Sequence, residues 1–313
     1  MSFVCASALK RVVNSRAFAR APSLMNTSNY LSRRVQLRSP SSSAYFATYP
    51  GMPLDAKASS IMKFGCPQYN PIRSFDRFVV SYDSRNKIPY WVYECIGKEN
   101  LCGDADRSKS EFKEDKKFPE HHRANLEDYK GSGYDRGHAT TSSNYSNSQK
   151  NMDESFTLSA IFPQLGWNFN SGMWNKVEKA IQGMAMNFEK EESAHIITGA
   201  LFLGKDDKGT KPSRVVQYHL IGKNDVAVPT HFFKVVLVEK GEDNFDEYAV
   251  LVPHINYSDD LSLSTFATSI EKIERLSGLH FFEKLCESDP PKIDKSRVRV
   301  LEESLWPLPH IKN

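Results

Sequence analysis

The chain has 313 residues, of which 40% are hydrophobic and 25% charged. This composition is typical of a folded globular protein and excludes a collagenous or largely disordered chain. With 41 basic and 38 acidic residues the net charge is +3, too small to indicate a nucleic-acid-binding protein by itself. No apolar run approaches the roughly 20 residues that a membrane-spanning helix needs.

The charge is unevenly distributed along the chain. The first 54 residues contain seven basic residues and no acidic one, and they are rich in Ser and Ala. Because this composition is typical of a mitochondrial transit peptide, we predict that residues 1–54 direct the protein to the mitochondrial matrix or intermembrane space. The alternative is a disordered basic arm, retained on the protein, that touches nucleic acid. Removing the segment leaves 34 basic and 38 acidic residues, a net charge of −4.

The first half of the chain contains strands, a charged loop and one helix. Aromatic and β-branched runs predict strands at residues 78–82 and 90–96, joined by a polar loop as an antiparallel hairpin. Residues 103–130 are highly charged, show no periodicity, and are predicted to form a long surface loop. Residues 156–164 are predicted to be a strand that ends at its proline, and apolar residues at helical spacing predict a buried helix over 171–190.

The second half is rich in strands separated by Gly, Asp and Lys turns. A short amphipathic helix is predicted over 265–276, capped by Gly278. The element order predicts one α+β domain over residues 55–285, with helices packed on a central antiparallel sheet. Residues 286–313 are a C-terminal extension whose role the pattern does not indicate. The strands predicted in this second half are residues 194–203, 215–221, 232–239 and 248–252.

The five cysteines and the tryptophans carry little functional signal. No C-x-x-C pair occurs, and five cysteines are too few for a disulfide framework, so a structural zinc site is not expected. Trp91, Trp167 and Trp174 are predicted to lie in the core rather than to serve as platforms for stacking nucleobases.

One of the nine histidines lies in an unusual setting, Gly131-Ser-Gly-Tyr-Asp-Arg-Gly-His138. The glycines permit close approach of the backbone, and a carboxylate, a guanidinium and an imidazole fall within four positions. An imidazole with a pKa near 6.5 can accept a proton at neutral pH, and an arginine can bind an anionic substrate.

A second cluster combines Asn170 with Glu178. An amide oxygen and a carboxylate suit a hard cation such as Mg²⁺. Eight helical residues separate the two Cα atoms by about 12 Å, so only one of the two side chains is expected to bind an ion directly. Asn170 is the better direct ligand, with Glu178 reaching the ion through a water molecule. The alternative is an N-cap at Asn170 and a solvated Glu178.

Taken in order, Asp135-Arg-Gly-His138, Pro163-Gln164, and Asn170 with Trp174 and Glu178 resemble the signature of the DNA/RNA non-specific endonucleases, which have the ββα-metal nuclease fold. Residues 129–138 and 222–234 resemble the mitochondrial endonuclease G branch, and the resemblance covers about residues 62–285. It implies an endonuclease that hydrolyses DNA and RNA to 5′-phosphate and 3′-hydroxyl ends. It also implies one Mg²⁺ or Mn²⁺, a homodimer, and a role in mitochondrial DNA turnover or, after release to the nucleus, in apoptotic DNA fragmentation.

The resemblance also implies roles for individual residues. His138 is expected to be the general base that activates water. Asn170 is expected to bind the metal, and Glu178 to orient a metal-bound water that protonates the leaving oxygen. Arg136, with Arg107 or Arg123, is expected to bind phosphate. Asp135 is expected to be a structural anchor of its loop.

One departure from the family pattern leaves alternatives open. Ala160 stands where the family usually has Asn, and the loss of an amide is expected to weaken catalysis, so that Ala160→Asn raises turnover. One alternative is a mitochondrial 5′-exonuclease of the same superfamily, with residues 286–313 as a candidate obstruction of the cleft. The other is a catalytically weakened relative that binds nucleic acid without cutting it.

Overall fold

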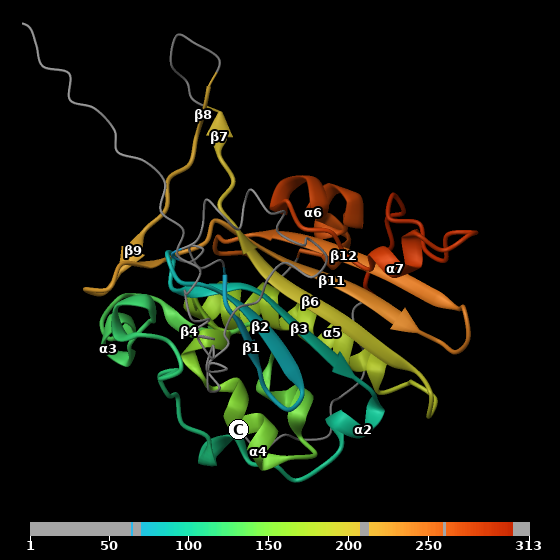
Figure 1. The fold of residues 1–313 in the computed structure, drawn as a ribbon, viewed down its shortest axis with the longest axis horizontal. Helices are drawn as coiled ribbons and strands as arrows, with labels where there is room; N and C mark the ends of the chain where they lie inside the picture. Colours follow the sequence, from blue (N-terminus) through green and yellow to red (C-terminus); the bar gives the residue numbers. More distant parts are fainter. Residues whose placement is uncertain (1–63, 65–69, 207–212, 259–260, 303–313) are drawn as a thin grey trace, which may run out of the picture. The chain divides into compact units, whose positions relative to one another are not determined.

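The computed structural model describes residues 64, 70–206, 213–258 and 261–302, so the predicted transit peptide lies outside the described residues. The central element is a six-stranded sheet in the order β1-β2-β3-β6-β11-β12, and all its neighbouring strands are antiparallel (Figure 1). This confirms the predicted α+β class. The strands are β1 (Ile72–Ser74), β2 (Phe78–Asp83), β3 (Ile88–Ile96), β6 (Ser193–Leu201), β11 (His231–Glu239) and β12 (Phe245–Pro253).

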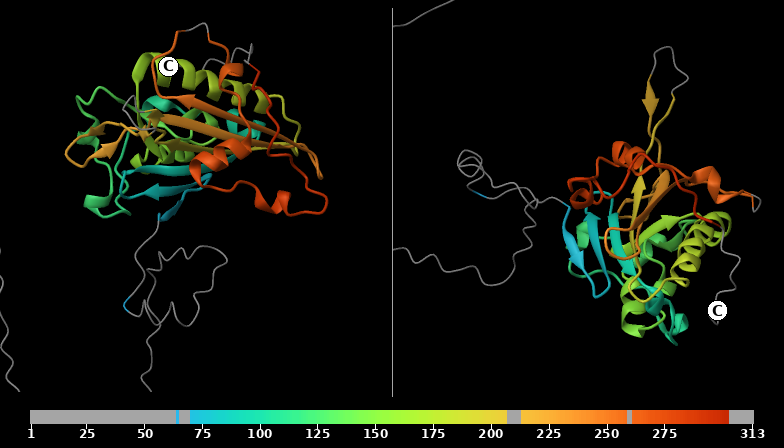
Figure 2. Two further views of the ribbon diagram at one scale, coloured as in Figure 1. Left: turned by 90° about the horizontal axis from the view of Figure 1, so that it is seen from above. Right: turned by 90° about the vertical axis from the view of Figure 1, so that its right-hand side faces the viewer.

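Side chains alternate across this sheet, so its strands contribute to two separate cores. On β11, Phe232 packs into the larger core together with residues of α5 (Asn175–Ala185). The next residue, Phe233, packs into the smaller core with residues of α6 (Ile270–Ser277). The left view of Figure 2 shows α5 and α6 on opposite sides of the sheet.

Apart from Arg107 and Arg123, the residues singled out by the sequence lie on a two-stranded sheet and the helical segments that follow it. β4 (Asp135–His138) pairs with β5 (Ile161–Gln164) in a separate two-stranded sheet. The predicted strand 156–164 is wrong in its first half, because η4 (Leu158–Ala160) is a 3₁₀ turn. Pro163 lies inside β5 instead of ending it. A strand with a partner on only one side tolerates the missing N–H of proline.

The predicted helix over 171–190 is wrong at both ends. A π-helical segment, η5 (Gly166–Trp174), precedes α5, and the Asn170 N–H donates to the Leu165 carbonyl at 2.9 Å. Gly172 interrupts it with φ −100° and ψ −107°, and α5 ends at Ala185. Asn170 therefore lies in the π-helical segment and is not the N-cap of α5.

Tertiary contacts also changed the elements predicted in the second half. The predicted strand 215–221 is paired only near its ends, and all of residues 213–220 are exposed. The predicted helix 265–276 starts at Ile270, because Ala267 bridges to Val250 and the Thr268 N–H donates to the Ala249 carbonyl at 2.9 Å. Its predicted cap is confirmed: Gly278 has φ 70°.

The charged segment 103–130 is mostly irregular but is held by buried residues, including Asp115, Phe118 and Asp128.

No helix within the described residues is both long and apolar enough to cross a membrane. The remaining short elements are α2 (Lys98–Leu101), α3 (Leu126–Tyr129), α4 (Gln149–Ser155), α7 (Glu283–Cys286), β7 (Lys205–Asp206), β8 (Arg214–Val215), β9 (Leu220–Ile221) and β10 (Val226–Ala227).

The described part of the C-terminal extension, residues 286–302, lies along β12 and α6. Val298 bridges to Ser269, directly before α6. Its basic side chains form ion pairs with acidic residues of these elements and of the turn before β12. These pairs join Lys292 to Asp243, Lys295 to Glu274, Arg297 to Glu247 and Arg299 to Asp246. The extension is thus anchored to elements that carry none of the predicted site residues, which gives no support to its predicted role as an obstruction.

Candidate active site

His138 ends strand β4 and lies in an apolar pocket. Its ring contacts the rings of Phe112 and Phe156, with centroids 5.5 and 4.6 Å away, and the residue is only 7% exposed. Burial, together with the nearby Arg107 charge, lowers the pKa of His138 to about 3. No described residue forms a hydrogen bond with the buried Nε2 atom. His138 is therefore held as a neutral imidazole, and its Nε2 atom has no partner among the described residues.

Two of the predicted phosphate-binding arginines lie beside His138. The Arg136 guanidinium stacks on the Phe112 ring at 4.3 Å, and the Arg107 guanidinium lies over the Phe156 ring at 5.4 Å. Arg107 also donates a hydrogen bond of 2.7 Å to the Ser142 hydroxyl. Both arginines are exposed. The two rings that contact His138 thus each also hold an arginine guanidinium, and these cations can bind an anionic substrate near the imidazole.

Arg123 is placed differently. It forms an ion pair with Glu114 at 3.1 Å and donates to the Phe118 carbonyl at 2.9 Å, and its side chain is largely buried. These contacts stabilise the charged segment 103–130. The structure does not bring Arg123 together with His138, so we leave it out of the proposed site.

Asp135 and Asn170 face each other across the start of the π-helical segment. The Asn170 Nδ2 atom donates to the Asp135 Oδ2 atom at 3.2 Å, which matches the anchoring role expected of Asp135. This bond fixes the amide and leaves its Oδ1 atom as an oxygen ligand. Among the described residues, no group of three or more His, Cys, Asp or Glu could hold a metal ion. The amide oxygen of Asn170 is a ligand type that suits a hard cation which keeps most of its own water.

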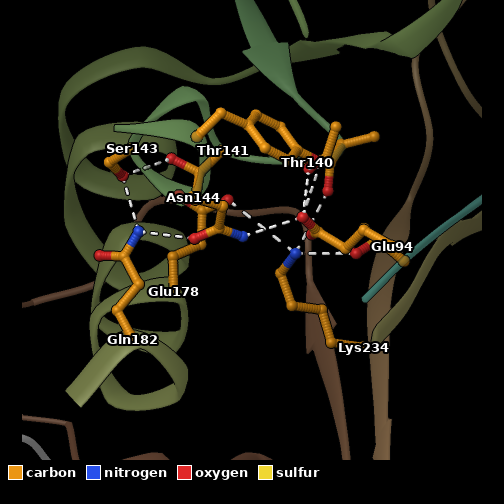
Figure 3. A network of polar contacts seen from close by, with 11 residues as sticks. Glu94, Thr140, Thr141, Ser143, Asn144, Glu178, Gln182 and Lys234 are labelled. Atoms are coloured by element: carbon orange, nitrogen blue, oxygen red, sulfur yellow. Dashed lines mark hydrogen bonds and ion pairs between the residues drawn. The ribbon is translucent and has the colours of Figure 1, made fainter. Parts of the chain in front are cut away.

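Glu178 lies in the first turn of α5 and points toward Lys234 of β11 (Figure 3). The Glu178 Oε1 atom is 4.0 Å from the Lys234 Nζ atom, and within the described chain it has no hydrogen-bond partner. Burial raises the pKa of Glu178 to about 7, against the opposing effect of Lys234. Lys234 is 2% exposed and donates to the Thr198 hydroxyl at 2.7 Å and to the Ala139 carbonyl at 3.2 Å.

A buried polar network continues from this pair to Glu94 of β3 (Figure 3). The Glu94 Oε2 atom accepts hydrogen bonds from Thr140 at 2.5 Å, Tyr145 at 2.9 Å and Asn144 at 3.0 Å. Asn144 in turn accepts a bond of 2.8 Å from Gln182 of α5. The network ties the segment after His138 to both the sheet and α5, so it fixes His138 relative to Glu178.

Glu94 and Lys234 were not predicted to belong to the site. Both lie at inward positions of apolar strand runs, where a charged residue is unusual unless it is paired. That signal was present in the sequence. The partners were not visible, because Glu94 and Lys234 are 140 positions apart and meet only through the pairing of β3, β6 and β11.

Two further residues position the site. A Cβ atom at Gly137 would lie 2.0 Å from the Gln164 Oε1 atom, so the position between Arg136 and His138 accommodates only glycine. His254 accepts a hydrogen bond of 2.7 Å from the Leu165 N–H, directly before the π-helical segment. Burial lowers the pKa of His254 to about 4, which keeps the ring neutral and able to accept that bond.

Ala160 is fully buried, and its carbonyl accepts the N–H of Ala139 at 2.9 Å. Its methyl group belongs to the larger apolar core. An asparagine at this position would have to place its amide in that core. The predicted gain of turnover in Ala160→Asn stays a prediction.

Comparisons with known proteins agree with this arrangement. Residues 57–288 match the profile of the DNA/RNA non-specific endonuclease family. The chain is 36% identical to the mitochondrial endonuclease G of Caenorhabditis elegans, over 80% of each chain. It is 38% identical to that of Homo sapiens, over 71% of this chain and 72% of the human one. A crystal structure of an EndoG/EndoGI complex matches with a TM-score of 0.67 and 33% identity, covering 79% of this chain and 100% of the other.

The fold and its hairpin-helix unit are those of a ββα-metal nuclease. The chain belongs to the DNA/RNA non-specific endonuclease family, whose members are metal-dependent hydrolases of phosphodiester bonds. The predicted endonuclease activity is thereby confirmed. The relatives are named as mitochondrial proteins, which confirms the predicted mitochondrial localisation.

Proposed function

We propose that this endonuclease cuts both DNA and RNA without regard to the sugar, and that His138 is its general base. The observation that supports this role most directly is the Nε2 atom of His138, which has no hydrogen-bond partner among the described residues and belongs to a ring that packs on the same aromatic rings as Arg107 and Arg136. From a water molecule in line with a phosphodiester bond, Nε2 takes the proton as the oxygen attacks phosphorus. The bond to the 3′-oxygen then breaks, and this oxygen takes a proton from a water molecule oriented by Glu178, which leaves 5′-phosphate and 3′-hydroxyl ends.

The charged residues around His138 bind and orient the phosphate in this proposal. Arg107 and Arg136 hold two of its oxygens from the two sides of the imidazole. Asn170, oriented by Asp135, would hold Mg²⁺ or Mn²⁺, with Glu178 supporting it through a water molecule. When bound, the cation neutralises charge on the phosphate and on the departing oxygen. Lys234 holds the Glu178 side chain in place.

The biological setting extends the proposal. We assign the enzyme to the matrix or the intermembrane space, with roles in mitochondrial DNA turnover or, after release to the nucleus, in the fragmentation of DNA in dying cells. We also propose that it works as a homodimer. Light scattering of the protein without residues 1–54 should then give twice the mass of one such chain, and a monomer at micromolar concentration would contradict the dimer.

Cleavage assays with circular substrates test the activity. Purified protein with Mg²⁺ should linearise and degrade a supercoiled plasmid and a circular RNA, and EDTA should stop both reactions. His138→Ala should lose about 10²- to 10⁴-fold in rate, the usual contribution of a general base. His121→Ala, which alters an exposed histidine, is the matched control and should keep full activity. Cleavage of linear ends alone would favour the 5′-exonuclease, and binding without cleavage the weakened relative.

A further inference from the structure

Trp167 is 84% exposed, although it lies in the same π-helical segment as Trp174, which is 1% exposed. The prediction that both tryptophans lie in the core is therefore wrong for Trp167. An exposed indole contributes no burial to folding. Large exposed aromatic groups beside a cleft are typical of binding surfaces.

The position of Trp167 is set by the turn that carries Asn170. The bond from the Asn170 N–H to the Leu165 carbonyl closes a turn in which Gly166 and Asn170 both approach Asp135. A Cβ atom at Gly166 would lie 3.2 Å from the Asp135 Oδ2 atom. Trp167 directly follows Gly166, and consecutive Cα atoms are about 3.8 Å apart. The backbone of Trp167 therefore lies close to the Asp135–Asn170 pair, and its indole is exposed there.

The backbone of Trp167 is also held closely. A Cβ atom at Gly172 would lie 3.1 Å from the Trp167 carbonyl oxygen, so glycine at 172 allows the segment to fold back against this residue. The indole is thus exposed on a segment that is fixed on both sides. Such an aromatic group can receive a ligand with little loss of its own conformational freedom.

We propose that Trp167 is a stacking platform for the nucleobase next to the phosphate that is cut. This inference rests on the proposed function of the Asn170 and His138 site and identifies the part of the substrate bound beside it. Every base has a π face, so stacking on an indole holds a strand without selecting a sequence. A base must leave its own stack to reach the indole, which favours single-stranded or locally unpaired substrates over intact duplex.

The test compares wild type with two variants of Trp167 and one control variant on matched substrates. Wild type, Trp167→Ala and Trp167→Phe are assayed on a single-stranded oligonucleotide and on the duplex of the same sequence. Val298→Ala, a change of an exposed apolar residue on the C-terminal extension, is the control. Trp167→Ala should raise KM for the single strand about fivefold or more, as expected from the loss of one stacked base, and affect the duplex less. Trp167→Phe should retain most of the affinity, and Val298→Ala all of it.

Abasic oligonucleotides make the test specific to stacking. One base is removed at a time near a single defined cleavage position, and binding of the labelled strand is measured alongside cleavage. At one position, removal of the base should weaken binding to wild type as much as Trp167→Ala weakens binding to the intact strand. Combining Trp167→Ala with that abasic strand should then lower the affinity no further than either change alone. Additive losses at every position, or equal losses on single strand and duplex, would overturn the stacking role. If no protein cleaves, the binding measurement still decides on Trp167, while the proposed function alone has failed.

Discussion

The two faces of the central sheet use the same strands for different purposes. The face toward α5 carries Glu94, Thr198 and Lys234 among its apolar residues, and these polar groups hold the segment after His138. The face toward α6 is filled by Phe233, Val235 and other apolar residues. Packing on the α6 face is mainly apolar, and its buried Glu247 is paired with Arg297 of the C-terminal extension, whereas the α5 face keeps buried charges that position catalytic side chains. Changes on the two faces should therefore separate stability from activity.

The largest expected effect comes from removing the buried cation on the polar face. Lys234→Met leaves Glu178 and Glu94 buried without their positive neighbour, which should cost about 3–5 kcal/mol of unfolding free energy. Activity per folded molecule should also fall, because Glu178 loses its position. Urea unfolding and kcat measured on the folded fraction check this. Lys272→Met, on the exposed surface of α6, is the control and should stay within about 0.5 kcal/mol of wild type.

A cavity on the apolar face should lower stability alone. Ile273 of α6 is fully buried, and Ile273→Ala should cost about 2–5 kcal/mol. Because its neighbours belong to the smaller core, kcat per folded molecule should equal that of wild type below the unfolding temperature. A matching fall in kcat would show that the two faces are coupled, and the comparison drawn above would be wrong.

The smallest expected effect is the pH dependence due to His138. Its folded pKa of about 3 lies below the unfolded value of about 6.5, so the unfolded chain binds the proton first. The neutral ring therefore contributes its full stability above pH 6.5, and that contribution falls as the pH drops toward 3. Between pH 6.5 and 5, wild type should lose about 2 kcal/mol more than His138→Gln. His254 adds a pH dependence of the same sign to wild type and to His138→Gln, so it cancels in this comparison. Equal slopes of unfolding free energy against pH in the two proteins would contradict the prediction.

The sequence predicted the parts of the fold that depend on local pattern. β11 was predicted within a residue of its observed start, and the Gly278 cap was predicted correctly, because strand periodicity and a left-handed glycine are local signals. Residues 215–221 have the composition of a strand but find almost no partner, and strand formation requires one. Ala267 and Thr268 fit a helix locally, yet pairing with β12 decides their conformation.

The candidate site was predictable where residues stand close together in sequence. His138, Asn170 and Glu178 belong to recognisable clusters, and the structure brings the first beside Arg107 and Arg136. The exposure of Trp167 was not predictable, because it lies before the predicted helix, in a π-helical segment that the local pattern does not indicate. Lys234 supports Glu178 only through strand pairing over a long stretch of chain, which periodicity does not reveal.

The two edge strands of the six-stranded sheet determine how readily another chain can pair with it. One edge strand, β1, has three residues, and the other, β12, is covered at its outer side by Ala267 and Thr268, with residues 292–299 bound beyond them. An exposed long strand is a template on which another chain can add its own strand. With one edge short and the other covered, the sheet offers little surface for chain-to-chain fibril growth. Ala267 and Thr268, followed by Ser269 that bridges to Val298 of the extension, thus leave little of β12 open to pairing with another chain.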